Sequence, residues 1–331
     1  MSGSYRSINY SLRPAKAIER KMLCEAFWRL YPFGKVEDYR YVGFGSIYFT
    51  DFNLFHRTLG ISDMLSIERD AYAKECFEFN RPYECVRMDF RNSSDSLPTL
   101  DWSKRTIVWL DYDGKLDEEA LADVGTVCTL GCSGSLLLVS VNAHVQSEPG
   151  EEDKKLYESE TGKAFSLDEY RLREIRKLLG DSLPTEVTGS QLRGKGIAQL
   201  CRKLVEAKIT EVLSVRNRFL PEEEKFTYQQ LFNFHYSDGA LMLTIGGILC
   251  EKRDLDKMAR GFFETLAFVK TGAEPYVIQV PCLTLKEMRH LNSQLPRLGV
   301  EGLTVPGVPP SQIKSYAEVY RYFPTFTEAL L

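Results

Sequence analysis

The sequence predicts an α/β protein in which a mostly parallel sheet of seven strands is wrapped by helices and interrupted by a helical insertion. Continuous apolar runs predict the strands at residues 39–44, 63–68, 84–89, 106–111, 135–141, 239–249 and 275–283. Segments with helical spacing of apolar residues separate the first four runs. Runs that are continuous rather than alternating are typical of strands covered on both faces.

The first four strands recur at a regular spacing. From Gly45 to Glu68, from Glu68 to Asp89 and from Asp89 to Asp111 the intervals are 23, 21 and 22 residues, each the length of one crossover unit. In an open parallel sheet the ligand crevice lies outside the carboxyl ends of the strands. We therefore expect the glycine and the three acids to meet at one edge.

The predicted domain boundaries lie where the regular spacing of strands ends. We predict that residues 1–145 and 234–285 form the sheet domain, with a helix over 15–30 at its start. No strand is predicted between 146 and about 233, and this stretch is interpreted as a helical insertion. Residues 286–331 are predicted to be a helical tail with two short helices around a Pro-rich loop.

Composition narrows the function classes. The chain has 331 residues and a formal net charge of −4, so any site for a polyanion has to be a local patch. No apolar run approaches the roughly 20 residues that cross a bilayer, and the first residues lack the apolar segment of a signal peptide. The eight cysteines form no CxxC pair, which supports neither a zinc site nor a disulfide framework. We expect a cytoplasmic protein with no membrane contact and no bound metal.

A glycine-containing turn, "YVGFGSIYF" at 41–49, follows the first strand. Glycine permits positive φ and close approach of a ligand, although a turn without a ligand has the same pattern. Tyr48 stands where a dinucleotide-binding turn has its third glycine, which packs the helix beneath a pyrophosphate. Glu68 could accept hydrogen bonds from ribose hydroxyls, and Asp89 could face an adenine amino group. The pattern favours an adenosine ligand without a pyrophosphate.

The series "VGFGS", "MLSIERD", "VRMDF" and "VWLDYDG" resembles the successive motifs of class I S-adenosylmethionine-dependent methyltransferases. The segments "NYSLRPAKAIERKM" and "DGALMLTIGG" more specifically resemble a group of bacterial proteins described as putative O-methyltransferases. The resemblance implies a Rossmann-like methyltransferase sheet and S-adenosylmethionine as the cofactor. The cofactor-binding residues that it implies are Gly43, Phe44, Gly45, Ser46, Glu68, Arg69, Asp89, Phe90 and Asp111.

One position departs from the family pattern. The family often has an acid two residues before the first glycine, and here that position is Tyr41. The usual contact to the amino group of the methionine moiety therefore lacks its carboxylate in the sequence.

Catalytic candidates follow the fourth strand in "LDYDGKL". Methyl transfer to an O- or N-nucleophile needs in-line geometry and, for a hydroxyl, removal of a proton. We predict that Asp111 lines the pocket, that Asp113 serves as the base and that Lys115 steadies the developing oxyanion. Asp113-Gly114 also fits an ordinary polar turn, and His144 is a second candidate for the base.

Two basic groups have open interpretations. Arg13, Lys16 and Arg20 share one helical face, which is either solvated or binds an acidic group of the acceptor or cofactor. Residues 191–218 carry a local charge of +5, which suits nucleic-acid phosphates. The same segment also suits a lid over a protein or small-molecule acceptor, or the surface of a homodimer. The acceptor itself is not predicted.

Two other functions stay open at this level. A nicotinamide-dependent oxidoreductase is disfavoured by Tyr48 in place of the third glycine. A non-catalytic binding or scaffold protein that keeps the fold is compatible with the unusual Tyr41.

Overall fold

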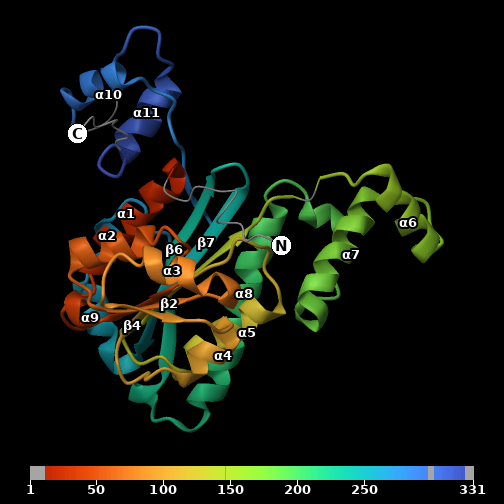
Figure 1. The fold of residues 1–331 in the computed structure, drawn as a ribbon, viewed down its shortest axis with the longest axis horizontal. Helices are drawn as coiled ribbons and strands as arrows, with labels where there is room; N and C mark the ends of the chain where they lie inside the picture. The colour runs from red at the N-terminus through yellow and green to blue at the C-terminus, as the bar shows by residue number, and fades with distance from the viewer. Residues whose placement is uncertain (1–11, 146, 297–301, 325–331) are drawn as a thin grey trace.

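A mixed, mostly parallel sheet runs through the protein (Figure 1). The computed structural model describes residues 12–145, 147–296 and 302–324. Within these ranges eight strands lie in the order β3-β2-β1-β4-β5-β7-β6-β8, with β7 antiparallel to both of its neighbours. The strands are β1 (Arg40–Gly43), β2 (Asp63–Ile67), β3 (Val86–Asp89), β4 (Thr106–Asp111), β5 (Leu136–Asn142), β6 (Phe226–Ser237), β7 (Leu241–Glu251) and β8 (Tyr276–Ile278).

Helices cover both faces of this sheet. Those of the first half are α1 (Pro14–Trp28), α2 (Thr50–Leu59), α3 (Lys74–Asn80), α4 (Ser93–Ser96) and α5 (Glu118–Leu130). Those of the second half are α6 (Glu151–Thr161), α7 (Leu167–Leu179), α8 (Gly196–Arg216), α9 (Leu255–Arg260), α10 (Leu285–Asn292) and α11 (Pro310–Val319).

Successive residues of the central strands pack into two different cores. In β1, Tyr41 lies in the core beneath α1, α2 and α3, whereas Val42 lies in the core beneath α5 and α8. In β4, Trp109 lies in the first of these cores and Val108 in the second. Because a strand alternates its side chains between the faces, burial on both faces produces the continuous apolar runs. The predicted α/β fold class is confirmed.

The sheet has one strand more than predicted. Strand β6 begins at Phe226, inside the stretch predicted to be free of strands. Its first half, "FTYQQ", carries polar residues that are only half-buried, and its pairing with β7 is irregular between Gln230 and Phe232. A half-exposed, bulged strand lacks the continuous apolar run on which the other predictions rested. The strand expected at 275–283 is the short edge strand β8.

The segment between β5 and β6 has two parts with different surroundings. Helix α8 packs on α5 and buries Ile197, Leu204 and Leu213 in the second core. Helices α6 and α7 instead extend to the side of the sheet (Figure 1). We call α6 and α7 the arm. Helix α7 contacts the second core through the buried Ile175 and Leu179 and through the partly buried Leu172 and Leu178.

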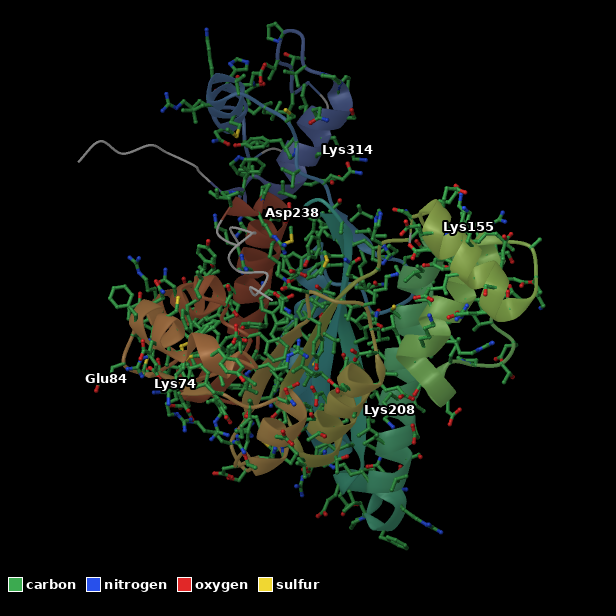
Figure 2. The ribbon with its side chains drawn as sticks, turned by 45° about the vertical axis from the view of Figure 1, so that its right-hand side comes forward. Lys74, Glu84, Lys155, Lys208, Asp238 and Lys314 are labelled. Carbon is green, nitrogen blue, oxygen red and sulfur yellow. The ribbon has the colours of Figure 1, made fainter. Side chains whose placement is uncertain are left out.

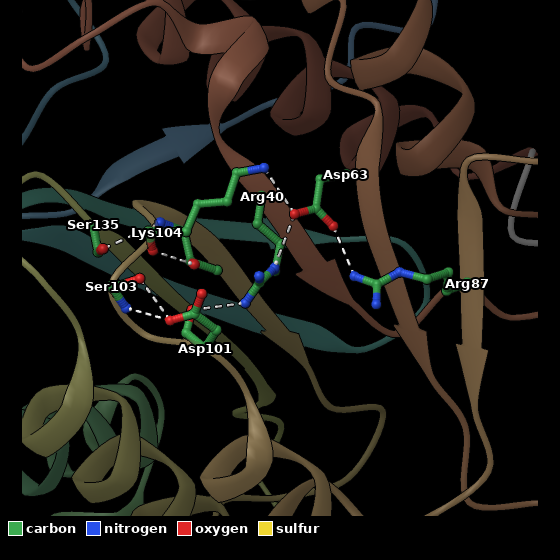
Figure 3. A network of polar contacts seen from close by, with 8 residues as sticks. Arg40, Asp63, Arg87, Asp101, Ser103, Lys104 and Ser135 are labelled. Atoms are coloured by element: carbon green, nitrogen blue, oxygen red, sulfur yellow. Dashed lines mark hydrogen bonds and ion pairs between the residues drawn. The ribbon is translucent and has the colours of Figure 1, made fainter.

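Ion pairs tie together the amino ends of the central strands (Figure 3). The Asp63 carboxylate at the start of β2 accepts from Arg40 of β1 at 3.2 Å, from Arg87 of β3 at 2.7 Å and from Lys104 before β4 at 2.9 Å. Burial alone raises the pKa of Asp63, but Lys104 and Arg40 outweigh it and hold the pKa below its ordinary value. The charged side chains at the amino ends of these strands therefore pair with one another, and the cavity lies at the opposite, carboxyl ends of the strands.

The start of α1 is fixed by the turn between β6 and β7. Asp238 accepts hydrogen bonds from the backbone N–H groups of Ala15 at 3.1 Å and Lys16 at 2.9 Å, and Figure 2 shows Asp238 beside this helix. A carboxylate suits the positive end of a helix, and Pro14 suits the first helical position. The "RPAK" and "DGAL" segments of the sequence therefore meet, and Lys16 is brought over the carboxyl edge of the sheet.

Two further findings concern the chain as a whole. In the part of the chain that the structure describes, no helix combines the length and the apolar character needed to cross a bilayer. None of the eight cysteines, all of which lie in the described ranges, is joined to another by a disulfide bond.

Candidate functional site

A cavity of about 720 Å³ lies at the carboxyl edge of the sheet. Its walls come from the ends of β1, β2 and β4 and from the loops that follow them, with contributions from α1 and α2. The crossover topology brings these segments together because the parallel strands all end at one edge. The predicted site residues that line it are Phe44, Gly45, Ser46, Glu68, Arg69, Asp111, Asp113 and Lys115.

Three predicted residues do not line this cavity. Gly43 is buried within β1, and Phe90 packs edge-on against Phe77 in the first core. Both oxygens of Asp89 are held by Arg91, at 2.8 and 2.6 Å, and Ser96 donates to one of them at 2.5 Å. The residues that follow, 91–93, line the cavity instead. The adenine contact of Asp89 stays a prediction.

Packing inside the protein dictates the glycine turn. A Cβ atom on Gly45 would lie 2.5 Å from a ring carbon of Phe49 and 2.8 Å from the Ser66 hydroxyl, which accepts from the Gly45 N–H at 3.0 Å. Phe49 has a φ of +44° and Ser46 a φ of +51°, values that non-glycine residues rarely adopt. The Ser46 Oγ is buried and has no hydrogen-bond partner among the described residues. Such strain and an unsatisfied hydroxyl beside a cavity are typical of a ligand site.

The structure supplies a carboxylate near the position where the family pattern lacks one. The Tyr41 hydroxyl donates to Asp51 at the start of α2, and Asp51 lines the cavity. Arg20 of α1 lines the cavity beside it, and the Arg20 Nε has no hydrogen-bond partner among the described residues. Burial raises the pKa of Asp51, against the opposing effect of the Arg20 guanidinium. Asp51 was not predicted as a site residue, and Arg20 was considered only as part of the basic face of the first helix.

The solvated interpretation of the α1 basic face is wrong for two of its residues. Lys16 is 2% exposed and Arg20 is 6% exposed. Arg20 lies four residues after Lys16 and therefore on the same face of the helix, and this spacing could have indicated its role. Asp51 has no comparable spacing in the sequence. Only the packing of α1 and α2 against the sheet puts them together.

Lys16 occupies the centre of a buried charge cluster. Its Nζ lies 2.7 Å from Asp111 and 2.9 Å from Glu19, and it donates to the Tyr236 hydroxyl at 3.0 Å. It also lies 4.2 Å from the centre of the Trp109 ring. Burial on its own lowers the pKa of Lys16, but the Asp111 and Glu19 carboxylates outweigh it and raise the pKa. Lys16 therefore holds the Asp111 carboxylate at the cavity wall.

The loop after β4 carries the predicted catalytic residues. The Asn142 N–H at the end of β5 donates to the Gly114 carbonyl at 2.9 Å, which ties this loop to the neighbouring strand. Asp113 is exposed at the cavity wall, and burial lowers the pKa of the half-buried Lys115. Among the described residues, no group of three or more His, Cys, Asp or Glu side chains could hold a metal ion.

A second cavity of about 510 Å³ adjoins the first. Lys115 lines both cavities. The remaining lining comes from Asn142 and His144 after β5 and from Glu174, Lys177 and Leu178 of α7. His144, the second candidate for the base, therefore belongs to this cavity rather than to the first.

The basic segment at 191–218 is largely engaged in contacts of its own. Arg216 packs over the Phe226 ring at 3.4 Å from its centre. Four of its basic side chains make polar contacts: Arg193 with Asp168, Arg202 with Glu206, Lys208 with Glu211, and Arg216 with the carbonyls of Cys128 and Gly131. Exposed ion pairs of this kind contribute little to stability, but they reduce the charge offered to phosphates.

The nucleic-acid hypothesis leads to a measurable expectation. Neutralising Arg193, Lys195, Arg202 and Lys203 together should lower the log–log salt dependence of RNA or DNA binding by about 0.9 for each phosphate that these side chains neutralise in the parent. Binding to bulk RNA and DNA at two salt concentrations measures this slope, with Lys74 and Lys155 neutralised in a control variant. A parent protein that binds neither polymer at low salt would remove nucleic acid from consideration.

Comparison with known proteins gives one match over nearly the whole chain. A family model described as "Putative O-methyltransferase" matches residues 8–331. A search of curated protein sequences found no significant match.

Several solved structures are similar in part. A putative O-methyltransferase from Klebsiella pneumoniae has 13% identity and a TM-score of 0.36, over 70% of this chain and 80% of that one. Human N-acetylserotonin methyltransferase, in complex with S-adenosylmethionine, has 9% identity and a TM-score of 0.33, over 70% and 51%. A probable spermidine synthase from Corynebacterium glutamicum has 13% identity and a TM-score of 0.35, over 43% of this chain and about half of its own length, 52%.

Proposed function

Because the chain belongs to the family described as putative O-methyltransferases, we propose that its larger cavity binds S-adenosylmethionine and that the protein transfers the methyl group to a hydroxyl oxygen of an acceptor. The observation that carries the proposal is the set of groups in that cavity. Around the glycine turn lie the Asp51 carboxylate, the Arg20 guanidinium and the Ser46 hydroxyl, which has no hydrogen-bond partner among the described residues. A second carboxylate, that of Glu68, follows the neighbouring strand β2.

These groups fit the parts of S-adenosylmethionine. Arg20, whose Nε lacks a partner among the described residues, suits the carboxylate of the methionine moiety, and Asp51 suits its ammonium group. The Ser46 hydroxyl lies at the turn beneath that moiety. Glu68 suits the ribose hydroxyls, and its Oε1 already accepts the Asp70 N–H at 3.0 Å, which orients the carboxylate. Burial raises the pKa of Glu68, against the opposing effect of this hydrogen bond.

Asp51 takes the part that the family pattern gives to an acid in the first strand. Tyr41 occupies that position and donates a hydrogen bond to Asp51, so that the carboxylate arrives from α2. The departure seen in the sequence therefore need not remove the contact to the ammonium group. This supports cofactor binding against the scaffold alternative.

The chemistry at the acceptor side depends on the loop after β4. When bound, S-adenosylmethionine would supply its sulfonium methyl group: the acceptor oxygen would bond to the methyl carbon in line with the breaking carbon–sulfur bond, and S-adenosylhomocysteine would be the leaving group. Asp111, held in place by Lys16, puts a negative charge at this wall, where it attracts the sulfonium cation. Asp113 is the proposed base that takes the hydroxyl proton, and Lys115 is proposed to stabilise the developing oxyanion.

Cofactor binding provides the first test. Glu68→Ala should weaken binding of S-adenosylmethionine at least tenfold, because charge-assisted hydrogen bonds contribute about 1.5–3 kcal/mol each. Isothermal titration calorimetry measures the affinity, and Glu84→Ala, which removes an exposed acid outside the cavity, is the matched control. Equal affinity of the Glu68 variant and the parent would place the ribose elsewhere.

The same titrations separate the alternative functions. An oxidoreductase would bind NAD in preference to S-adenosylmethionine and S-adenosylhomocysteine. A scaffold protein would bind a ligand without turnover. Transfer of a labelled methyl group to fractions of cell extract, followed by identification of the methylated atom, tests the O-methyltransferase activity directly. Transfer to nitrogen or absence of transfer to every fraction would contradict the proposal.

A further inference from the structure

We propose that the methyl acceptor is a small molecule that carries a carboxylate or phosphate group beside its hydroxyl, and that the second cavity binds this acidic group. The inference rests on the proposed function, since it assigns a substrate class to the same site. The cavity is defined by Lys115, Asn142, His144, Glu174, Lys177 and Leu178.

The position of the second cavity places it on the acceptor side. Lys115 follows the strand that carries Asp111 and lines both cavities. The hydrogen bond between the Asn142 N–H and the Gly114 carbonyl joins the loops after β4 and β5, and the His144 N–H donates to the Asn142 Oδ1 at 2.8 Å. A molecule whose hydroxyl lies near Asp113 can therefore extend past Lys115 towards the arm.

The charge of this lining favours an anion. Two lysines face one glutamate, and Lys177 lies 2.6 Å from Glu174 in the same turn of α7. Burial is the largest effect on the pKa of Lys115 and lowers it, Cys201 and Glu174 oppose burial, and Arg171 of α7 adds a smaller lowering effect. A half-buried ammonium interacts more strongly with an anion than a fully solvated one does, because the local dielectric constant is lower. A carboxylate or phosphate in this cavity would therefore interact most strongly with the half-buried Lys115, and Lys177, whose side chain is 55% exposed, would add a weaker attraction.

The size of the space favours a small molecule. Cavities of about 300–1,000 Å³ are typical of small-ligand sites, and this one measures about 510 Å³. It is bounded by α7 on one side and by the β4 and β5 loops on the other. A neutral acceptor would use the same volume but would gain nothing from the net positive charge of the lining.

The test uses three probes that differ in one group. Isothermal titration of the full chain, saturated with S-adenosylhomocysteine, is run with 3-hydroxybenzoate, 3-hydroxyphenyl phosphate and neutral 3-hydroxybenzamide. We expect at least one acid to bind at least tenfold more tightly than the amide. The difference between the two acids identifies which anionic group the cavity prefers.

Substitutions in the arm give effects of opposite sign. Lys177→Gln should weaken the preferred acid about tenfold and leave the amide unchanged, whereas Glu174→Gln should strengthen the acid. Lys155→Gln, an exposed lysine of α6 in the same arm (Figure 2), is the matched control and should change neither. Thermal melting of each variant checks that it is folded.

Each other outcome has one meaning. An amide that binds as well as both acids, an acid preference that survives Lys177→Gln, or a parent that binds S-adenosylhomocysteine but none of the probes would overturn the acidic-acceptor inference alone. A parent that does not bind S-adenosylhomocysteine would overturn the proposed function, and the inference with it.

Discussion

Replacing Lys16 with methionine should lower the free energy of unfolding by about 3–5 kcal/mol near pH 8, because it leaves the buried Glu19 carboxylate and the partly exposed Asp111 carboxylate without their cation. Glu19 is 0% exposed, and both Glu19 and Asp111 lie within 2.9 Å of the Lys16 Nζ. Methionine fills a similar volume, so the loss reports the charge rather than a cavity. Urea unfolding of the variant and the parent measures the difference.

The loss should grow as the pH rises from 5 to 8. Burial raises the pKa of Glu19 in the parent even though Lys16 opposes it, and without Lys16 the pKa rises further. A carboxyl group whose folded-state pKa lies above its unfolded value stabilises the fold below the unfolded pKa, and that contribution is lost as the pH rises through the folded pKa. Unfolding measured at both pH values tests the sign.

Two variants control this experiment. Lys16→Met combined with Glu19→Gln should recover a large part of the loss at pH 8, since the buried charge is then removed with its partner. Lys35→Met removes a lysine that is 76% exposed and should leave the unfolding curve unchanged. An equal loss at pH 5 and pH 8, or no recovery in the double variant, would contradict the charge explanation.

Replacing Gly45 with alanine or valine should reduce both stability and cofactor affinity. The added Cβ would lie 2.5 Å from the Phe49 ring and 2.8 Å from the Ser66 hydroxyl, so the turn has to shift. Overpacking of this kind costs about 1–3 kcal/mol, and the displaced turn no longer presents Ser46 to the cavity. Thermal unfolding and titration with S-adenosylmethionine measure the two effects, and valine should have the larger of each.

Gly114 provides the matched glycine for this comparison. A Cβ atom there meets nothing within 4 Å, so Gly114→Ala should unfold at the temperature of the parent or slightly higher. If Gly45→Ala is as stable as Gly114→Ala and binds S-adenosylmethionine normally, then neither the packing beneath the turn nor its position at the cofactor is as described.

Much of the site could be predicted because the pattern that reveals it is local. Each parallel strand is a continuous apolar run, and the polar residue that ends it marks the carboxyl edge. Glu68 and Asp111 were found in this way, and both line the larger cavity. Asp89 was found in the same way, but Arg91 and Ser96 hold its oxygens. The end of a strand in the sequence therefore predicts where a side chain lies in the fold. The groups that it binds depend on the residues packed around it, which the strand pattern does not reveal.

The role of Gly45 illustrates the same limit within a single turn. A glycine after a strand indicates that no side chain is tolerated there, without showing what occupies the space. The occupant is the ring of Phe49, four residues later, held in a left-handed conformation. The first half of β6 is polar and ends in a bulge, so it gives no continuous apolar run by which the start of the strand could be predicted.

By itself the sequence determined the α/β sheet, the alternation of strands and helices in its first half and the edge at which the polar strand ends meet, because these depend on periodicity and on residues a few positions apart. The tertiary structure alone decided which charges meet there. Lys16 is 95 positions from Asp111 in the chain, and Asp238 is 223 positions from Ala15, at the start of the helix that it fixes. Such pairs form only when α1 packs against the carboxyl edge of the sheet. Burial then makes an unpaired charge strongly destabilising, so that the folded state requires each buried charge to be paired.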